Sequence, residues 1–154
     1  VLVYGGDRYS PHLCCPFRAE ILDVVTCRSL GCLVYFRADI NKSSEWEAGR
    51  WEVTVRADGS TLGSCEVELP ASPNAEGDCT GDLLLKIGSD GQAIERASSQ
   101  RDFSDDTASE FTVRLERDGQ QVAGQTFSPE FDRLQPNGPG CPPICHQAEA
   151  DFSF

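Results

Sequence analysis

Residues 51–70, WEVTVRADGSTLGSCEVELP, predict a β-hairpin. The first half alternates apolar and polar residues, a period of two that places one set on each face of a strand. Asp58-Gly59 follows, a pair that tolerates the positive φ angles of a tight reversal. The returning apolar residues end at Pro70, which has no N–H to contribute to a strand pair.

A second copy of this pattern, FTVRLERDGQQVAGQTF, occupies residues 111–127, with Asp118-Gly119 in the place of Asp58-Gly59 and Phe111 in the place of Trp51. Turn signals elsewhere bring the expected total to about eight or nine short strands. No amphipathic helix is predicted. The sequence therefore predicts an all-β fold, an Ig-like antiparallel sandwich of two sheets stabilised by disulfides, with both aromatic residues in the core.

The chain length of 154 residues fits one domain, residues 1–154, in which residues 1–18 form an N-terminal edge strand and loop extension. Further strands are expected at 19–27, 32–40, 83–87, within 89–96 and at 146–154. Residues 41–49, 71–78 and 97–109 are expected to be polar loops. Residues 128–145 carry many prolines and are expected to form a rigid connection without regular structure.

Composition limits the partners of the chain. Charged residues make up 25% and hydrophobic residues 39%, which is ordinary for a globular protein. The formal net charge is −12, so the chain as a whole repels phosphate backbones and anionic lipid surfaces. Nucleic-acid binding and direct membrane insertion are therefore not expected.

The eight cysteines indicate an oxidising compartment. The chain has no Met, even at position 1, which fits a processed, exported protein, and it has no apolar run long enough for a transmembrane helix. We therefore expect an extracytoplasmic location: the periplasm, the outer surface or the medium.

The cysteine spacing suggests particular disulfides. Cys65 pairs with Cys79 across a hairpin-like excursion, and Cys27 pairs with Cys32 across a short turn. For the other four, two arrangements stay open. Either Cys141 pairs locally with Cys145 and leaves a vicinal Cys14–Cys15 bond, or Cys14 and Cys15 join Cys141 and Cys145.

The segment Cys141-Pro-Pro-Ile-Cys145-His146 allows a different function. C-x3-C-H is one residue longer than the haem attachment pattern C-x-x-C-H. His12, Cys14, Cys15 and His146 are suitable zinc or copper ligands, and Asp102, Asp105 and Asp106 supply oxygen ligands for calcium. Solvated acidic loops and structural disulfides explain the same residues without a metal, so no cofactor and no metal are assigned. No catalytic residue is assigned either, because neither His lies in a recognisable nucleophile motif.

The segment from Phe127 to Ala148, with PNGPGC-x3-CHQA, together with the Asp-Gly hairpins and the early CRSLGC, resembles small exported bacterial lipoprotein-type proteins with an Ig-like sandwich. The resemblance covers roughly residues 22–154. It implies the fold and an exported location and carries over no catalytic residue.

From these observations we expect a non-enzymatic interaction or structural module. It would bind another protein, or its own copies, through edge strands such as the first and the last, or through loops at the ends of the sandwich. Trp46 is either a satellite core residue or an exposed aromatic at such a surface. The alternative function is a redox, metal or haem protein that uses the C-x3-C-H segment.

Overall fold

The computed structural model describes residues 27–32, 35–100 and 108–154. Ten strands form the described chain: β1 (Phe36–Asn41), β2 (Gly49–Ala57), β3 (Ser60–Leu69), β4 (Asp78–Gly81), β5 (Leu83–Ile87), β6 (Ile94–Ser99), β7 (Phe111–Arg117), β8 (Gln120–Phe127), β9 (Asp132–Leu134) and β10 (Cys145–Ser153). Among the described residues no helix is long and apolar enough to cross a membrane.

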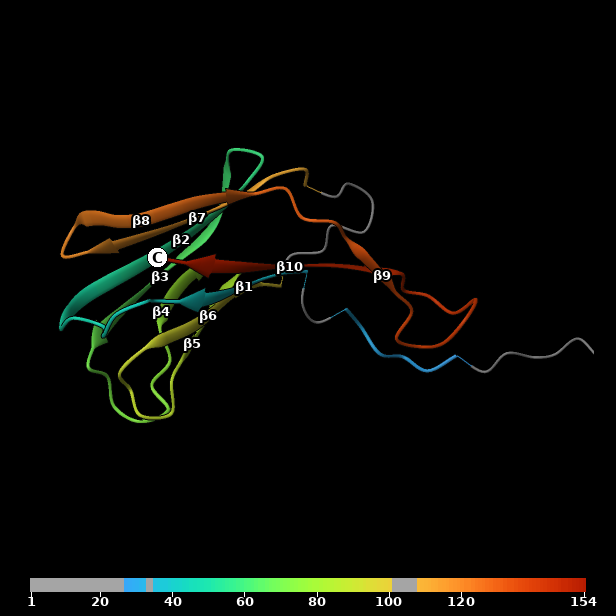
Figure 1. Ribbon diagram of the computed structural model, residues 1–154. Coiled ribbons are helices and arrows are strands. Elements are labelled where there is room, and N and C mark those ends of the chain that lie inside the picture. Colours follow the sequence, from blue (N-terminus) through green and yellow to red (C-terminus); the bar gives the residue numbers. More distant parts are fainter. Residues whose placement is uncertain (1–26, 33–34, 101–107) are drawn as a thin grey trace, which may run out of the picture.

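The strands form two five-stranded sheets that pack face to face (Figure 1). The first sheet has the order β5-β6-β1-β10-β9 and the second has the order β4-β3-β2-β7-β8. The predicted all-β, disulfide-stabilised two-sheet sandwich is confirmed. One detail differs: β1 and β10 pair in parallel, whereas the other strand pairs are antiparallel.

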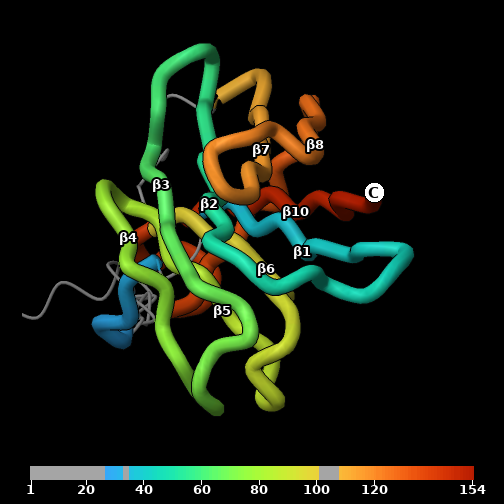
Figure 2. The backbone as a smooth tube through the Cα atoms, turned by 90° about the vertical axis from the view of Figure 1, so that its left-hand side faces the viewer, coloured from blue at the N-terminus to red at the C-terminus, as the bar shows by residue number. Residues whose placement is uncertain are grey.

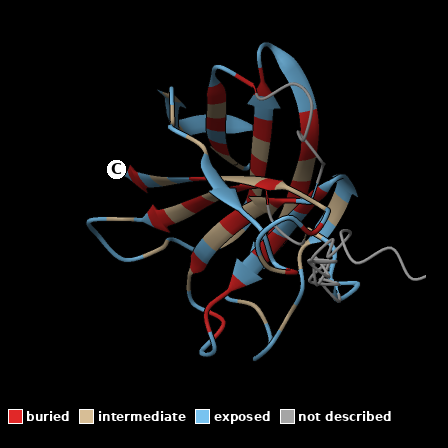
Figure 3. Cartoon of the chain, turned by 90° about the vertical axis from the view of Figure 1, so that its right-hand side faces the viewer, coloured by how far each residue is buried: buried red, intermediate tan, exposed pale blue. Residues whose placement is uncertain are grey.

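Both predicted hairpins are present, and each has the expected two-residue turn. Asp58 and Gly59 have φ angles of 45° and 81°, and Asp118 and Gly119 have φ angles of 50° and 80°. Positive φ at both central positions matches the right-handed twist of the flanking strands. The alternating residues that start from Trp51 are buried along β2. Figure 3 shows such alternation of buried and less buried residues as stripes along several strands.

Aromatic contacts join the two sheets in the core. The ring of Phe36 on β1 stacks on that of Phe111 on β7, with centroids 4.0 Å apart. Trp51 is fully buried, and its indole N–H donates to the carbonyl of Glu47 at 3.0 Å. Trp46 packs edge-on against Trp51, with centroids 4.7 Å apart, so it is a satellite core residue.

Two expectations about irregular segments were wrong. Residues 128–145 contain β9, which pairs with the start of β10, and β6 extends through Ser99 into the expected loop. β9 has only three residues, and the end of β6 pairs with both β5 and β1, so a local pattern gives little signal for either strand. The strands expected at 1–4 and 19–26 lie outside the described residues.

The disulfide pattern confirms one predicted pair and corrects the others. Cys65 and Cys79 are bonded, as predicted. Cys27 is bonded to Cys141 and Cys32 to Cys145, so the predicted Cys27–Cys32 and Cys141–Cys145 bonds are wrong. The alternative that gave Cys141 and Cys145 to Cys14 and Cys15 is wrong for the same reason; Cys14 and Cys15 themselves lie outside the described residues.

The physical reason is the parallel pairing of β1 with β10. The predicted Cys27–Cys32 bridge assumed a short turn between two strands, whereas residues 27–32 form neither a turn nor a strand. They lie beside the segment that precedes β10, where Leu30 donates its N–H to the Asn137 side chain at 2.9 Å and accepts from the same amide at 2.9 Å. The two disulfides therefore connect the entrance of β1 to the entrance of β10.

Candidate functional site

The two hairpins are structurally equivalent at an offset of 60 residues. In each, the returning strand carries one extra residue, Leu62 in β3 and Val122 in β8, at the point where the register shifts. Asp58 and Asp118 both exchange hydrogen bonds with the neighbouring hairpin. β2 and β7, the first strands of the hairpins, pair with each other in the middle of the sheet. The second sheet is thus built around a pair of matching hairpins.

The returning strands differ in their surroundings. β3 has β4 as its outer neighbour, and the Cys65–Cys79 disulfide joins the two strands. Leu62 is consequently only 4% exposed. Among the described strands β8 pairs with β7 alone, and Val122, which corresponds to Leu62, is 45% exposed. The position that β4 occupies beside β3 has no counterpart beside β8 in the described part of the chain.

β8 also lacks the features that protect edge strands. Natural edges carry charges, Pro or inward-pointing Lys that prevent another strand from adding. The sequence QQVAGQTF has none of these. Because a quarter of all residues are charged, a strand of eight residues would carry two on average. The bulge at Val122 lies near the turn, and residues 123–127 pair with β7 in uninterrupted register.

The other edges are protected. β4 and β9 are short, and β5 carries Lys86, which forms an isolated bridge with Glu76. Beyond residues 145–147, which pair with β9, this edge of β10 has no partner among the described strands, and Glu149 and Asp151 are exposed there. We expected the first and last strands to accept a partner. The first lies outside the described residues, and the last bears the charges that oppose strand addition.

Half-buried apolar side chains lie on the face of β8 that is turned toward the first sheet. Ala123 and Phe127 share the inward-facing side of the strand and are neither fully covered nor fully exposed. The Phe127 ring lies 6.3 Å from that of Phe152 on β10, and Figure 2 shows β8 and β10 on the same side of the sandwich. On the outer face, the hydroxyls of Thr112 and Thr126 are 2.9 Å apart and tie β8 to β7. A segment added beside β8 would cover apolar surface on one face and meet small polar groups on the other.

The cysteines of the C-x3-C-H segment form disulfides in the structure. Cys141 and Cys145 are buried, and both sulfur atoms form disulfides, so in this state neither is available as a thioether or thiolate. His146 is half-buried at the start of β10, and its Nδ1 is buried without a hydrogen-bond partner. No three His, Cys, Asp or Glu side chains within the described ranges converge as metal ligands. His12, Asp102, Asp105 and Asp106 lie outside those ranges.

Sequence reasoning missed β8 as the open edge, although it recognised the repeated hairpin. The absence of charge in residues 120–127 was the available signal. Comparison of the chain with protein-family models, curated proteins and solved structures found no match. The resemblance to exported bacterial lipoprotein-type proteins therefore stays a prediction, and the structure itself has to support any functional assignment. The three disulfides fit an oxidising environment.

Proposed function

We propose that this protein is a non-enzymatic, extracytoplasmic interaction module that binds an extended segment of another protein along β8. The segment would add to the second sheet as a new outer strand, with main-chain hydrogen bonds supplying affinity and alternate side chains supplying specificity. The disulfides and the predicted export support the location outside the cytoplasm.

The observation that carries this proposal is the difference between two equivalent strands. β3 and β8 return from matching turns with matching bulges, yet β3 is covered by β4, whereas β8 has no outer neighbour among the described strands. An eight-residue edge that is uncharged and exposed favours association with another strand. In a chain with a net charge of −12, the local absence of charge makes β8 a surface that a partner can approach without desolvating ionised groups.

The side chains of β8 and the net charge of the chain indicate which residues the bound segment should contain. Side chains that face inward would contact Ala123 and Phe127, so alternate residues of the segment should be apolar. The residues between them would lie beside Gly124 and Thr126 and should be small or polar. A net charge of −12 repels a second copy of this chain and favours a neutral or basic partner.

A matched pair of substitutions tests this assignment. Gln125→Lys places an inward-pointing charge on the exposed edge, and Gln92→Lys makes the same change in charge at an exposed turn outside the second sheet. Ten-residue segments would be selected from a displayed random library against the wild-type protein. We expect the selected segments to be neutral or basic and to bind Gln125→Lys at least about tenfold more weakly, or about 1.4 kcal/mol, with no change for Gln92→Lys.

Amide hydrogen exchange on the same samples locates the bound segment. Added strand pairing should slow exchange within residues 123–127 and leave β10 unchanged. The proposal is overturned if the selected segments bind both variants equally, or if protection appears at another edge. It is also overturned if the wild-type protein forms a dimer that Gln125→Lys abolishes, because the occupant of the edge would then be a second copy.

A further inference from the structure

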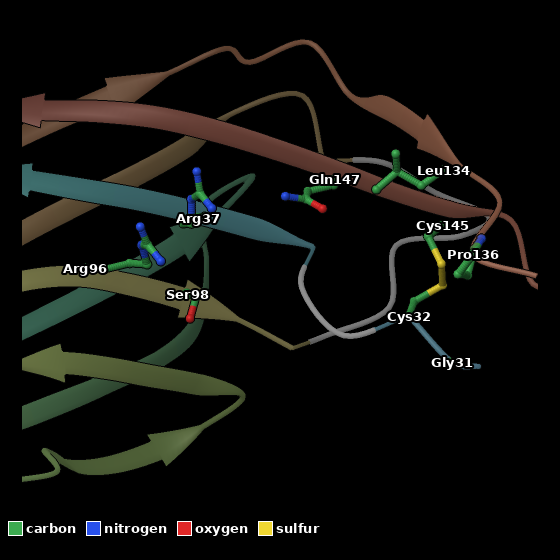
Figure 4. A pocket seen from close by; sticks show the side chains of 9 residues that line it. All are labelled: Gly31, Cys32, Arg37, Arg96, Ser98, Leu134, Pro136, Cys145 and Gln147. Atoms are coloured by element: carbon green, nitrogen blue, oxygen red, sulfur yellow. A yellow bond between two sulfur atoms is a disulfide. The ribbon is translucent and has the colours of Figure 1, made fainter.

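The outer face of the first sheet contains a cavity of about 320 Å³ that is separate from the β8 edge. Side chains from β1, β6 and β10 form one end of it, and the segments around the Cys32–Cys145 disulfide form the other (Figure 4). Its volume is at the small end of the range for ligand pockets, about 300–1,000 Å³. A cavity of this size admits a compact molecule and excludes a folded partner.

The polar end of the cavity is formed by two guanidinium groups on neighbouring strands. Arg37 extends from β1, and Arg96 extends from β6 beside it. Asp39 accepts from Nε of Arg96 at 2.6 Å, and Glu149 pairs with Nη2 of Arg37 at 2.9 Å. These two carboxylates balance the charge of the two arginines, and Asp39 lies within 4 Å of both guanidinium groups.

The guanidinium groups retain unused donors. Nε of Arg37 is buried without a hydrogen-bond partner among the described residues, and an Asp39 carboxylate oxygen lies 3.6 Å from it. The hydroxyl of Ser98 also lines this end. Gln147 donates its amide N–H to Glu149 at 3.0 Å and so keeps an amide oxygen at the rim. The side chains of Arg37 and Arg96 are 29% and 36% exposed and both line the cavity, so a ligand with acceptor oxygens can reach them and form charge-assisted hydrogen bonds.

The opposite end of the cavity is apolar. Leu134 at the end of β9 is 44% exposed, and it lines the cavity together with Pro136 and the Cys32–Cys145 disulfide. The sticks in Figure 4 show these groups at one end and the two arginines at the other. A ligand that fills the cavity therefore needs an acidic group at one end and an apolar body at the other.

We propose that this cavity binds a small organic monocarboxylate whose apolar body packs on Leu134 and whose carboxylate bonds to Arg37 and Arg96. Arg guanidinium groups match the planar geometry of a carboxylate and form charge-assisted hydrogen bonds with it. A single negative charge is specified because the net charge of −12 repels polyanions. This inference does not rest on strand addition at β8.

Phenylacetate and the uncharged phenylacetamide form a matched pair of probes, because they share the apolar body and differ in charge. Each would be titrated into protein labelled with nitrogen-15, and NMR would follow the side-chain Nε–H signals of Arg37 and Arg96. We expect phenylacetate to shift both signals saturably and to bind at least about tenfold more tightly than phenylacetamide. The proposal is wrong if the two probes bind equally, or if the Nε–H signals show no saturable shift up to about 10 mM phenylacetate.

Two exposed leucines on this sheet supply the matched variants. Leu134→Ser alters the apolar end of the cavity, and Leu84→Ser makes the same change on β5, where Leu84 is 48% exposed and outside the cavity. Both positions are exposed, so both variants should fold. Leu134→Ser should weaken phenylacetate binding several-fold, and Leu84→Ser should leave it unchanged; equal effects of the two variants would contradict the assignment of the ligand to this cavity.

Discussion

Asp58 and Glu110 exchange two hydrogen bonds between the turn of the first hairpin and the start of the second. The N–H of Asp58 donates to the carbonyl of Glu110 at 2.9 Å, and the N–H of Glu110 donates to the Asp58 carboxylate at 3.0 Å. Asp118 and Arg50 repeat this exchange at 2.8 and 3.0 Å, with the roles of the hairpins reversed. Each Asp-Gly turn therefore anchors the first strand of the other hairpin, which explains why both turns carry Asp at this position.

The first prediction concerns the pH dependence of stability at Asp58. The Ser109 hydroxyl donates to its carboxylate at 2.8 Å, and the N–H groups of Ser109 and Glu110 also donate to it, so the pKa of Asp58 is lowered from its ordinary value. A lowered pKa in the folded state means that this contribution to stability is present above the ordinary Asp pKa. It is lost as the pH falls through the folded-state pKa.

Asp58→Asn removes this titration and keeps a side chain that tolerates positive φ. The melting temperature of the variant should be lower than that of the wild type at neutral pH, and the difference should shrink as the pH falls below about 4. Asp151→Asn, at an exposed position on β10, controls for the change in net charge. A difference in melting temperature that stayed constant from neutral to acid pH would show that the carboxylate charge does not contribute.

The second prediction compares the two equivalent bulge residues. Leu62→Ala should lower the free energy of unfolding by about 2–5 kcal/mol, because Leu62 is buried under the β4–β5 side of the sandwich. Val122→Ala removes exposed surface at the matching position and should change stability by less than about 0.5 kcal/mol. Urea denaturation of the two variants measures both values. A loss above about 1 kcal/mol for Val122→Ala would mean that β8 is covered in the free protein.

The local patterns were sufficient to predict the hairpins and the sandwich. Alternation from Trp51 and from Phe111, together with the Asp-Gly turns, depends on neighbouring residues only. The Cys65–Cys79 bond could be predicted for the same reason, since its two strands are adjacent in sequence and in the sheet. Local periodicity specifies which face of a strand is buried and leaves its neighbours undetermined.

The strand order could not be predicted from local sequence patterns, because it depends on contacts between segments that are distant in the sequence. The parallel pairing of β1 with β10 joins residues more than a hundred positions apart, and it decides which cysteines meet. Nothing near Cys27 or Cys32 indicates that neighbour. The same applies to the cavity, where Arg37, Arg96 and Leu134 come from three strands whose order only the folded sheet defines.

The third prediction concerns the two long-range disulfides, which are not independent. Each closes a loop of over a hundred residues when it is the only one of the two, with sequence separations of 114 and 113. Once Cys32–Cys145 is formed, Cys27–Cys141 closes only 5 + 4 = 9 further residue steps, because Cys27 precedes Cys32 by five and Cys141 precedes Cys145 by four. In the chain-entropy model a loop of that size contributes about 2.6 kcal/mol, against about 4.8 kcal/mol for the long loop.

Replacing Cys27 and Cys141 by Ser should therefore cost about 2.6 kcal/mol, and replacing Cys32 and Cys145 should cost a similar amount. Replacing all four should cost about 7.4 kcal/mol, which exceeds the sum of the two separate losses because the last constraint on the long loop is then removed. Urea denaturation of the three variants, with Cys65–Cys79 intact, measures this coupling. Losses that simply add would contradict it, because they would mean that residues 27–32 stay close to residues 141–145 in the unfolded chain without either disulfide.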